Sequence, residues 1–230
     1  MKSPKLQILY EDNHLLALNK PAGLATMGAA ADVESLVSLA KQYLKRRYQK
    51  PGNVYLGVVS RLDAVVSGVV LLARTSKAAA RLAEQFRLRD VKKTYWAVVA
   101  GVVEPDTGQW VDWLIKDEAH HKMVLAAPDR QGAKEARLHY RRMAILPRGS
   151  LLEIDLETGR KHQIRVQLAE RGLPVLGDRK YGSSLALEPR SPAIALHARQ
   201  LTVRHPVRDE DITLLAPLPA NWARLGVDRQ

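Results

Sequence analysis

The chain has 230 residues, 46% of them hydrophobic and none of them cysteine, so it can bury a substantial core but cannot form disulfides or thiolate metal sites. No apolar run approaches the roughly 18 residues that span a bilayer, and the basic start lacks the apolar core of a signal peptide. The absence of cysteine suits a reducing cytoplasm, where we expect the protein. Lys and Arg total 36 against 24 Asp and Glu. The formal net charge of +12 favours a polyanionic partner such as nucleic acid, and the alternatives are a basic surface without a binding role or a membrane-surface protein.

The first hundred residues combine strands with two amphipathic helices. We expect strands at 6–10, 15–18, 54–59, 69–73 and 93–100. Apolar residues at helical spacing predict a helix over 33–48, whose opposite face carries Lys41, Lys45 and Arg46 as a solvated or phosphate-facing stripe. A second helix over 77–88 follows a Ser or Thr that can serve as its N-cap.

The rest of the chain reads mainly as strands. Residues 103–135 are polar and irregular, and we expect loops or short hairpins there. A short helix over 161–171 is closed by Gly172. Further strands are expected at 137–145, 151–156, 194–203 and 212–215. With no internal repeat or linker, the pattern predicts a single α+β domain over 1–230, built on a large, mixed but mostly antiparallel sheet with flanking helices.

Several common functional motifs are absent from the sequence. The patterns GxGxxG and GxxxxGK[ST], which hold nucleotide phosphates, do not occur, and neither does HExxH. The adjacent His120 and His121 lie in a polar stretch typical of solvated residues, and the seven histidines form no cluster with metal-ligand spacing. Ser38 and Lys41 match S-x-x-K, but the partner motifs are missing and helical periodicity explains both residues. The sequence thus offers no recognisable metal or nucleotide site.

One carboxylate is distinguished by its surroundings. Asp63 and Arg61 lie in a short connection between two strongly apolar runs, so the chain carries Asp63 to the margin of the core. An Asp at such a place can also simply cap the turn before Ser67 and Gly68. Considered alone, this segment favours the turn over a catalytic role.

Two further segments bring charge and aromatic side chains together. Arg160, Lys161 and Arg165 surround the predicted start of the third helix, where an anion is favoured, and a solvated basic helix end is the alternative. The segment 91–101 places Tyr95 at the mouth of a buried strand, where ordinary core packing is the alternative.

Taken together, in this order and spacing, the segments resemble the RluA family of pseudouridine synthases. The family pattern H-R-L-D-x-x-T-S-G is similar to residues 60–68, K-K-x-Y to residues 92–95, and G-R-x-H-Q-[IL]-R to residues 159–165. Weaker matches occur at 18–23, 177–182 and 196–198. The resemblance covers the chain from about residue 6 to about residue 215, and six motifs in register are hard to obtain by chance.

The resemblance implies an RNA pseudouridine synthase, an isomerase that acts on uridines in structured ribosomal or transfer RNA without a cofactor or a metal. It gives Asp63 the role of catalytic carboxylate, Arg165 that of its ion-pair partner, and Tyr95 that of stacking on uracil and transferring a proton. Attack of Asp63 on the sugar, its addition to the base, and proton transfer alone all stay open. The resemblance implies RNA contacts from Arg61, Lys92, Lys93, Arg160, Lys161, His162 and Gln163.

The resemblance further implies a pseudouridine-synthase-type domain with a central basic cleft. We also expect a monomer, and an absence of the small N-terminal RNA-binding module of many relatives, for which the stretch before residue 6 is too short. Three positions depart from the family pattern: Ser60 and Gln167 each replace His, and Val66 replaces Thr. These changes concern rate and RNA preference more than reaction type. A catalytically silent RNA-binding protein on the same scaffold is the first alternative. A hydrolytic glycosidase is the second, although most glycosidases need two carboxylates.

Overall fold

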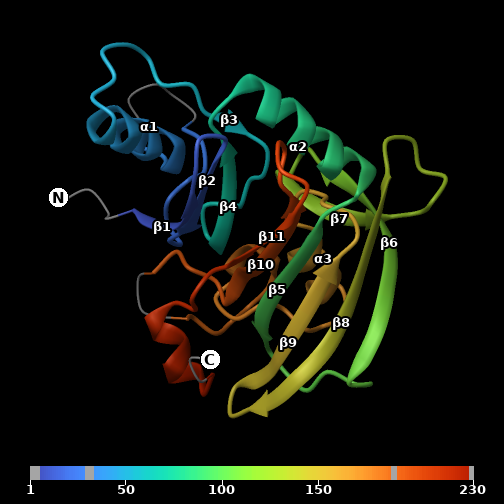
Figure 1. Ribbon diagram of the computed structural model, residues 1–230. Coiled ribbons are helices and arrows are strands. Elements are labelled where there is room, and N and C mark those ends of the chain that lie inside the picture. The colour runs from blue at the N-terminus through green and yellow to red at the C-terminus, as the bar shows by residue number, and fades with distance from the viewer. Residues whose placement is uncertain (1–5, 29–33, 188–190, 228–230) are drawn as a thin grey trace. The chain divides into compact units, whose positions relative to one another are not determined.

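The computed structural model describes residues 6–28, 34–187 and 191–227, which divide into two compact units (Figure 1). Unit 1 comprises the chain up to Val91 together with Ala198–Pro217. Unit 2 comprises Lys92–His197 and the chain from Leu218 onward. The single catalytic domain expected over 1–230 stays a prediction. Within the described ranges, no helix is both long and apolar enough to cross a membrane.

Unit 1 is an antiparallel sheet with two helices. Its strands are β1 (Gln7–Glu11), β2 (Leu15–Lys20), β3 (Gly57–Val58), β4 (Ser67–Ala73), β10 (Leu196–Arg204, from Ala198 onward) and β11 (Asp211–Leu215). Their order is β1-β2-β4-β10-β11, and β3 pairs with the end of β4. The helices are α1 (Leu36–Arg47), which begins after the N-cap Ser35, and α2 (Ser76–Leu88), which begins after the N-cap Thr75.

The two helices cover opposite faces of this sheet because side chains alternate along a strand. The α2 side chains Ala78 and Leu82 share a buried cluster with odd-numbered strand residues such as Leu15 and Leu71. The α1 residues pack instead with even-numbered strand residues such as Leu16 and Leu72. Figure 1 shows α1 and α2 on either side of β2 and β4. Both faces of β4 are therefore buried, which explains its continuous apolar run.

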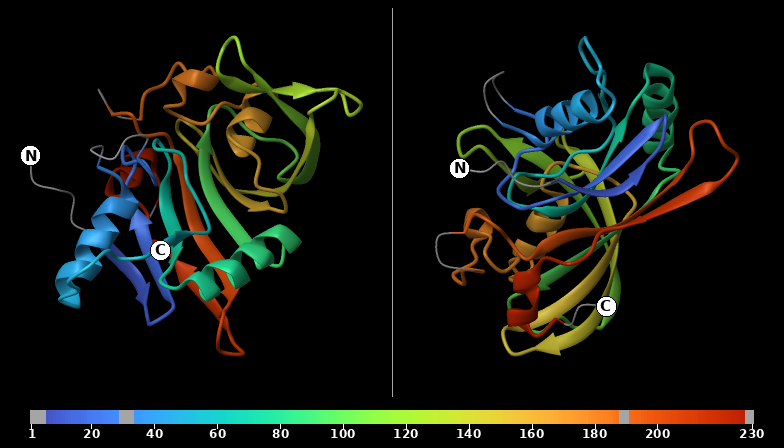
Figure 2. Two further views of the ribbon diagram at one scale, coloured as in Figure 1. Left: turned by 90° about the horizontal axis from the view of Figure 1, so that it is seen from above. Right: turned by 60° about the vertical axis from the view of Figure 1, so that its left-hand side comes forward.

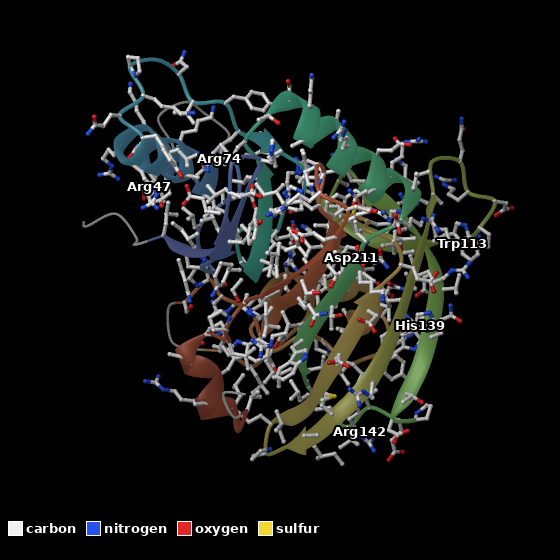
Figure 3. The ribbon with its side chains drawn as sticks, in the orientation of Figure 1. Arg47, Arg74, Trp113, His139, Arg142 and Asp211 are labelled. Atoms are coloured by element: carbon white, nitrogen blue, oxygen red, sulfur yellow. The ribbon has the colours of Figure 1, made fainter. Side chains whose placement is uncertain are left out.

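A carboxylate ties α1 to the sheet edge. Glu11 accepts hydrogen bonds from the hydroxyls of Tyr43 and Tyr48 at 2.8 and 2.6 Å, and from Arg74 Nη1 at 3.2 Å. Arg47, at the end of α1, and Arg74, after β4, both lie over the Tyr48 ring. Figure 3 labels the two arginines. These contacts fix the C-terminal turn of α1 while its remaining basic side chains stay exposed.

Unit 2 is a second antiparallel sheet, in the order β5-β9-β8-β6-β7. Its strands are β5 (Lys92–Val99), β6 (Thr107–Asp117), β7 (Lys122–Ala126), β8 (Lys134–Leu146) and β9 (Gly149–Leu156). The helix α3 (Gln163–Ala169) packs on this sheet through Val166, which meets Leu114 and Ala136. Figure 2 shows α3, in orange, within the hollow of the curved strands. Two short 3-10 helices are η1 (Arg179–Tyr181) and η2 (Ala220–Leu225).

The structure confirms the α+β class and most predicted elements. The prediction of loops or short hairpins over 103–135 is confirmed only in part: β6 and β7 form an antiparallel hairpin, but β6 is an 11-residue strand that also pairs with β8. The strand expected at 54–59 is reduced to the two residues of β3. The third helix is shorter than predicted, since it begins after His162, whose φ of 55° is left-handed, and ends at Ala169. Val33, predicted in the first helix, lies outside the described residues.

Candidate active site

The loop that carries Asp63 is held by hydrogen bonds on both sides of that residue. Thr26 Oγ1 donates to the carbonyl of Leu62 at 2.9 Å and accepts from its N–H at 3.1 Å. On the other side, the carbonyl of Ala64 accepts from the N–H of Gly23 at 2.8 Å. The Asp63 carbonyl closes a turn by accepting from the Val66 N–H at 3.1 Å. The half-exposed Asp63 side chain thus projects from a backbone fixed against the segment after β2.

A lysine completes this support from inside the core. The side chain of Lys20, at the end of β2, is fully buried. Its ammonium donates to the carbonyls of Pro21, Leu24 and Ala64 at 2.9, 2.7 and 3.1 Å. Burial lowers the pKa of Lys20 to about 8, and the negative charge of Asp63 opposes that shift. A cation therefore lies close enough to Asp63 for the two charges to interact.

The positions of the residues on either side of the Asp63 loop explain part of the sequence motif at residues 60–68. Ser60 Oγ accepts from the Leu71 N–H at 3.1 Å, so the hydroxyl that replaces the family's histidine anchors the loop to β4. Val66, in place of threonine, is buried in unit 1. Gly68 has a φ of 120°, and a Cβ there would come within 2.3 Å of the Ala198 carbonyl oxygen on β10. Only glycine allows β4 to approach β10 this closely.

Unit 2 holds the other predicted catalytic residues. Tyr95 is half-buried on β5, opposite Ile154 of β9. Arg165, on α3, is buried and donates from Nε and Nη2 to the two carboxylate oxygens of Asp178 at 2.6 and 2.8 Å. The Tyr181 ring lies 5.0 Å from the guanidinium carbon of Arg165. Because Asp63 belongs to unit 1, its pairing with Arg165 stays a prediction.

The motif that precedes α3 is held by its own side chains. Gln163 is buried, and its Oε1 accepts from the Thr158 hydroxyl at 2.7 Å and from the Arg160 N–H at 3.0 Å. Arg160 Nε donates to the Glu135 carbonyl at 2.7 Å. His162 Nδ1 lies 2.7 Å from the Tyr181 hydroxyl. These contacts shape the turn into α3.

The predicted RNA-contacting residues differ in exposure. Arg61, Lys92 and Lys161 are exposed, whereas Lys93, Arg160 and His162 are half-buried and Gln163 is buried. Their contacts with RNA stay predictions. Gln167, the third departure from the family pattern, is buried and donates to Asp112 Oδ2 at 2.7 Å, so it serves the packing of α3 on β6.

Sequence reasoning missed three residues that support these positions: Lys20, Thr26 and Asp178. Lys20 and Asp178 do fall in the weaker motif matches at 18–23 and 177–182, which was the available signal. Within residues 6–28, 34–187 and 191–227, no group of three or more His, Asp or Glu could hold a metal ion.

Comparison with known proteins identifies the family. Residues 14–170 match the model of the RNA pseudouridylate synthase family. The chain is 36% identical over 231 residues to ribosomal large subunit pseudouridine synthase D of Xanthomonas campestris, covering 96% of this chain and 68% of that protein. It is 34% identical over 221 residues to the dual-specificity RNA pseudouridine synthase RluA of Haemophilus influenzae, covering 93% of each.

A solved structure agrees with the sequence comparison. Human RNA pseudouridylate synthase domain containing 4 matches with a TM-score of 0.78 and 28% identity, covering 96% of this chain and 94% of that one. The family match covers more than half of the chain, and the RluA relative is matched along nearly its whole length. The chain therefore belongs to the RNA pseudouridylate synthase family and is an RluA-type RNA pseudouridine synthase, an isomerase.

Proposed function

We propose that this enzyme isomerises specific uridines in structured ribosomal or transfer RNA, with Asp63 as the catalytic carboxylate. The observation that carries the proposal is the loop at residues 60–66, which holds a half-exposed carboxylate between two backbone positions pinned by Thr26 and Gly23. Fixed placement of a reacting group is a major source of catalysis. The similar protein from Xanthomonas campestris is named for the large ribosomal subunit, which supports a ribosomal RNA target.

The reaction breaks the ribose–nitrogen bond of uridine, rotates the base, and rejoins it to the sugar through carbon. An ionised carboxylate can attack carbon as a nucleophile or accept a proton as a base. Asp63 supplies this group, through attack on the sugar, addition to the base, or proton transfer. Because the product is an isomer of the substrate, the chemistry needs no external oxidant or reductant.

Arg165 and Tyr95 complete the proposed set. The salt bridge with Asp178 uses two of the five N–H donors of Arg165 and fixes the plane of its guanidinium. In this proposal the guanidinium, oriented by Asp178, binds and orients the carboxylate of Asp63. Tyr95 stacks on the uracil ring, with its hydroxyl positioned to transfer a proton.

In this proposal, basic side chains in both units bind the RNA. Arg61 lies beside Asp63 and can fill the space left by a flipped nucleotide, while Lys92, Lys93, Arg160, Lys161 and His162 supply contacts from unit 2. Gln163 contributes to RNA binding indirectly, because its hydrogen bonds shape the turn into α3. A base inside a helix must be extruded at a cost of a few kcal/mol, so loops and bulges are the favoured targets. We further propose a monomer acting in the cytoplasm.

The segment around α1 carries further basic side chains. No acidic residue occurs between positions 35 and 62, which contain Lys41, Lys45, Arg46, Arg47, Lys50 and Arg61. Lys41 and Lys45 line a surface pocket of about 370 Å³ together with Gly52 and Asn53. Phosphate groups are the expected occupants of such a surface in an RNA-modifying enzyme.

The test measures tritium release from RNA labelled at uracil carbon 5. Asp63→Asn should abolish release while RNA binding survives, and Asp129→Asn, at an exposed position, should behave as the wild type. Substantial turnover by Asp63→Asn would reject the assignment. Release of free uracil in place of pseudouridine would favour a glycosidase, and binding without any pseudouridine would favour a silent RNA-binding protein.

A further inference from the structure

A surface pocket of unit 1 lies between the C-terminal half of α1 and the segment that leads to β3. Its volume is about 370 Å³, within the range of roughly 300–1,000 Å³ that is usual for ligand sites. Figure 1 shows this segment, in cyan, next to α1. None of the lining residues belongs to the Asp63 loop. They are Lys41, Gln42 and Lys45 of α1, followed by Gly52, Asn53 and Val54.

Both walls of the pocket are fixed by the fold. On the helix, Leu44 is buried in the same apolar cluster as Val54 and Leu56 of the following segment. At the end of α1 the Lys50 N–H donates to the Lys45 carbonyl at 3.1 Å, which turns the chain back along the helix. The segment after α1 is thus tied to the helix at both of its ends. A pocket that is formed before its ligand arrives costs less ordering free energy to fill.

The side chains that line the pocket combine three kinds of chemistry. Lys41 and Lys45 are exposed and carry ammonium groups, which attract phosphate. Gln42 and Asn53 are exposed amides, and each has a carbonyl acceptor and an NH2 donor. Val54 is buried and contributes an apolar surface. No Asp or Glu occurs between positions 35 and 62, so this segment supplies no carboxylate that would repel an anion.

These features match a nucleotide of single-stranded RNA better than a phosphate group alone. An unstacked base offers an apolar face for packing and an edge of donors and acceptors that side-chain amides can bind. The phosphates on either side of the base can meet the two lysines. A free phosphate would use the lysines and leave the amides and the valine without a role. The pocket therefore fits a nucleotide from a loop or a bulge, where bases are unstacked.

We propose that this pocket binds one nucleotide of the RNA substrate, other than the uridine that is modified. Its base packs on Val54, with its edge bound by the amides of Gln42 and Asn53. The adjoining phosphates lie against Lys41 and Lys45. The inference rests on the proposed RNA substrate and goes beyond phosphate contacts, because it gives the two amides a part in the choice of RNA. It assigns them no part in the chemical step.

The first experiment observes the pocket directly by NMR of ¹⁵N-labelled protein. Single-stranded tetranucleotides of adenosine, cytidine or uridine are added, and the side-chain NH2 signals of Gln42 and Asn53 are followed. Both signals should shift to saturation, with different affinities for the three bases, while the NH2 signal of Gln109 in unit 2 stays unchanged. Absence of a shift at the two pocket amides with all three oligonucleotides would overturn the proposal. Equal affinities would reject recognition of the base edge.

Two smaller probes separate RNA from other sources of phosphate. Inorganic phosphate at the same ionic strength should leave the amides of Gln42 and Asn53 unshifted, and an equal shift would mean that the pocket binds phosphate alone. Uridine monophosphate should bind more weakly than the uridine tetranucleotide, because it lacks the second phosphate. Equal affinity for the two would assign the pocket to a free nucleotide and overturn the role in RNA binding.

The second experiment separates base recognition from the attraction of charge. Binding of a labelled single-stranded RNA of mixed sequence is titrated at several salt concentrations. Gln42→Ala combined with Asn53→Ala should weaken binding about 10-fold with an unchanged salt dependence, because hydrogen bonds to a base are lost and no charge is. Lys41→Gln combined with Lys45→Gln should reduce the slope of log K against log salt by about 1.4, since each phosphate contact to a single strand contributes roughly 0.7.

The matched control removes two exposed amides from unit 2. Gln109→Ala combined with Gln131→Ala should bind RNA as the wild type does. If the double variant at Gln42 and Asn53 binds as tightly as this control, the amides do not contact RNA and the proposal is wrong. If the amides respond but the wild type releases no tritium from labelled RNA, the proposed function fails and the pocket stands. If tritium is released and the amides do not respond, the pocket proposal fails alone.

Discussion

Arg165 and Asp178 form a bidentate salt bridge in which both side chains are almost fully buried, with 6% and 1% of their surfaces exposed. Asp178 precedes η1, and Tyr181 at the end of η1 places its ring against the same guanidinium. The Tyr181 hydroxyl in turn accepts from the Met123 N–H at 3.0 Å. The segment from Asp178 to Tyr181 therefore holds Arg165 from two directions and joins it to β7.

The first prediction concerns this salt bridge. Asp178→Asn should destabilise the protein by about 3–5 kcal/mol, because it removes the carboxylate that makes the bidentate pair with a buried guanidinium. It should also lower the rate of pseudouridine formation, since the guanidinium loses the contact that fixes its plane. Urea unfolding and tritium release measure the two effects.

A double-mutant cycle provides the control for this prediction. Arg165→Met combined with Asp178→Asn should be less destabilising than the sum of the single changes, because each single change already removes the interaction between the two side chains. Asp211→Asn, at an exposed position on β11, should change neither stability nor rate. Additive effects of the two changes at Arg165 and Asp178 would show that the pair contributes little.

The second prediction concerns the glycine after the carboxylate loop. Gly68→Ala should severely destabilise unit 1, because the new Cβ would lie within 2.3 Å of the Ala198 backbone at a φ of 120°. Gly52→Ala is the matched control, since nothing lies within 4 Å of a Cβ at that position. Thermal unfolding of both variants measures the difference. A Gly68→Ala protein as stable as Gly52→Ala would contradict the close approach of β4 and β10.

Apolar patterning predicted α2 and the strands β2, β4 and β9, because apolar residues make up most of the buried face of each element. It failed for β6, where the pattern is inverted. Val111 of β6 points outward, while Asp112 points inward and binds Arg171 and Gln167. Because β6 exposes a valine and turns a carboxylate inward to bind side chains of α3 and its C-terminal end, its sequence does not show the usual alternation of apolar and polar residues.

The candidate site was predictable in part for similar reasons. The Asp63 loop could be recognised because its motif is contiguous in sequence. The salt bridge that supports Arg165 could not be recognised in the sequence. Asp178 lies 13 residues from Arg165 and contacts its guanidinium only after α3 and η1 have folded. Lys20 reads as an ordinary polar residue at the end of a strand, and only the fold shows that its ammonium is buried among carbonyls.

The third prediction concerns the basic face of α1. Replacing Lys41, Lys45 and Arg46 together by Gln should weaken RNA binding and reduce the slope of log K against log salt by about 2, because each lost phosphate contact releases roughly 0.7–0.9 fewer counterions. Titration of labelled RNA at several salt concentrations measures the slope. Single-turnover rates at saturating protein should change little, since the face lies outside the Asp63 loop.

The control removes the same charge from unit 2. Lys116, Arg130 and Arg148 are exposed, and their joint replacement by Gln lowers the net charge equally. We expect this control variant to change the slope of log K against log salt less than the α1 variant does. Equal slopes for the two triple variants would mean that overall charge, rather than the α1 face, governs binding.

The fourth prediction concerns acid stability, through the cluster that joins the β1–β2 turn to the β10–β11 hairpin. Burial alone would raise the pKa of Asp12, but hydrogen bonds from the N–H groups of His14 and Leu15 and from the His205 ring lower it to about 2. The pKa is thus lower in the folded state than its ordinary value of 3.8, so this group stabilises the fold above pH 4 and loses that contribution as the pH falls towards 2. The contribution should be on the order of 2 kcal/mol. Urea unfolding of the wild type and Asp12→Asn between pH 2 and pH 6 measures it: the difference in unfolding free energy should shrink as the pH falls from 4 to 2, and a constant difference over that range would contradict the assignment.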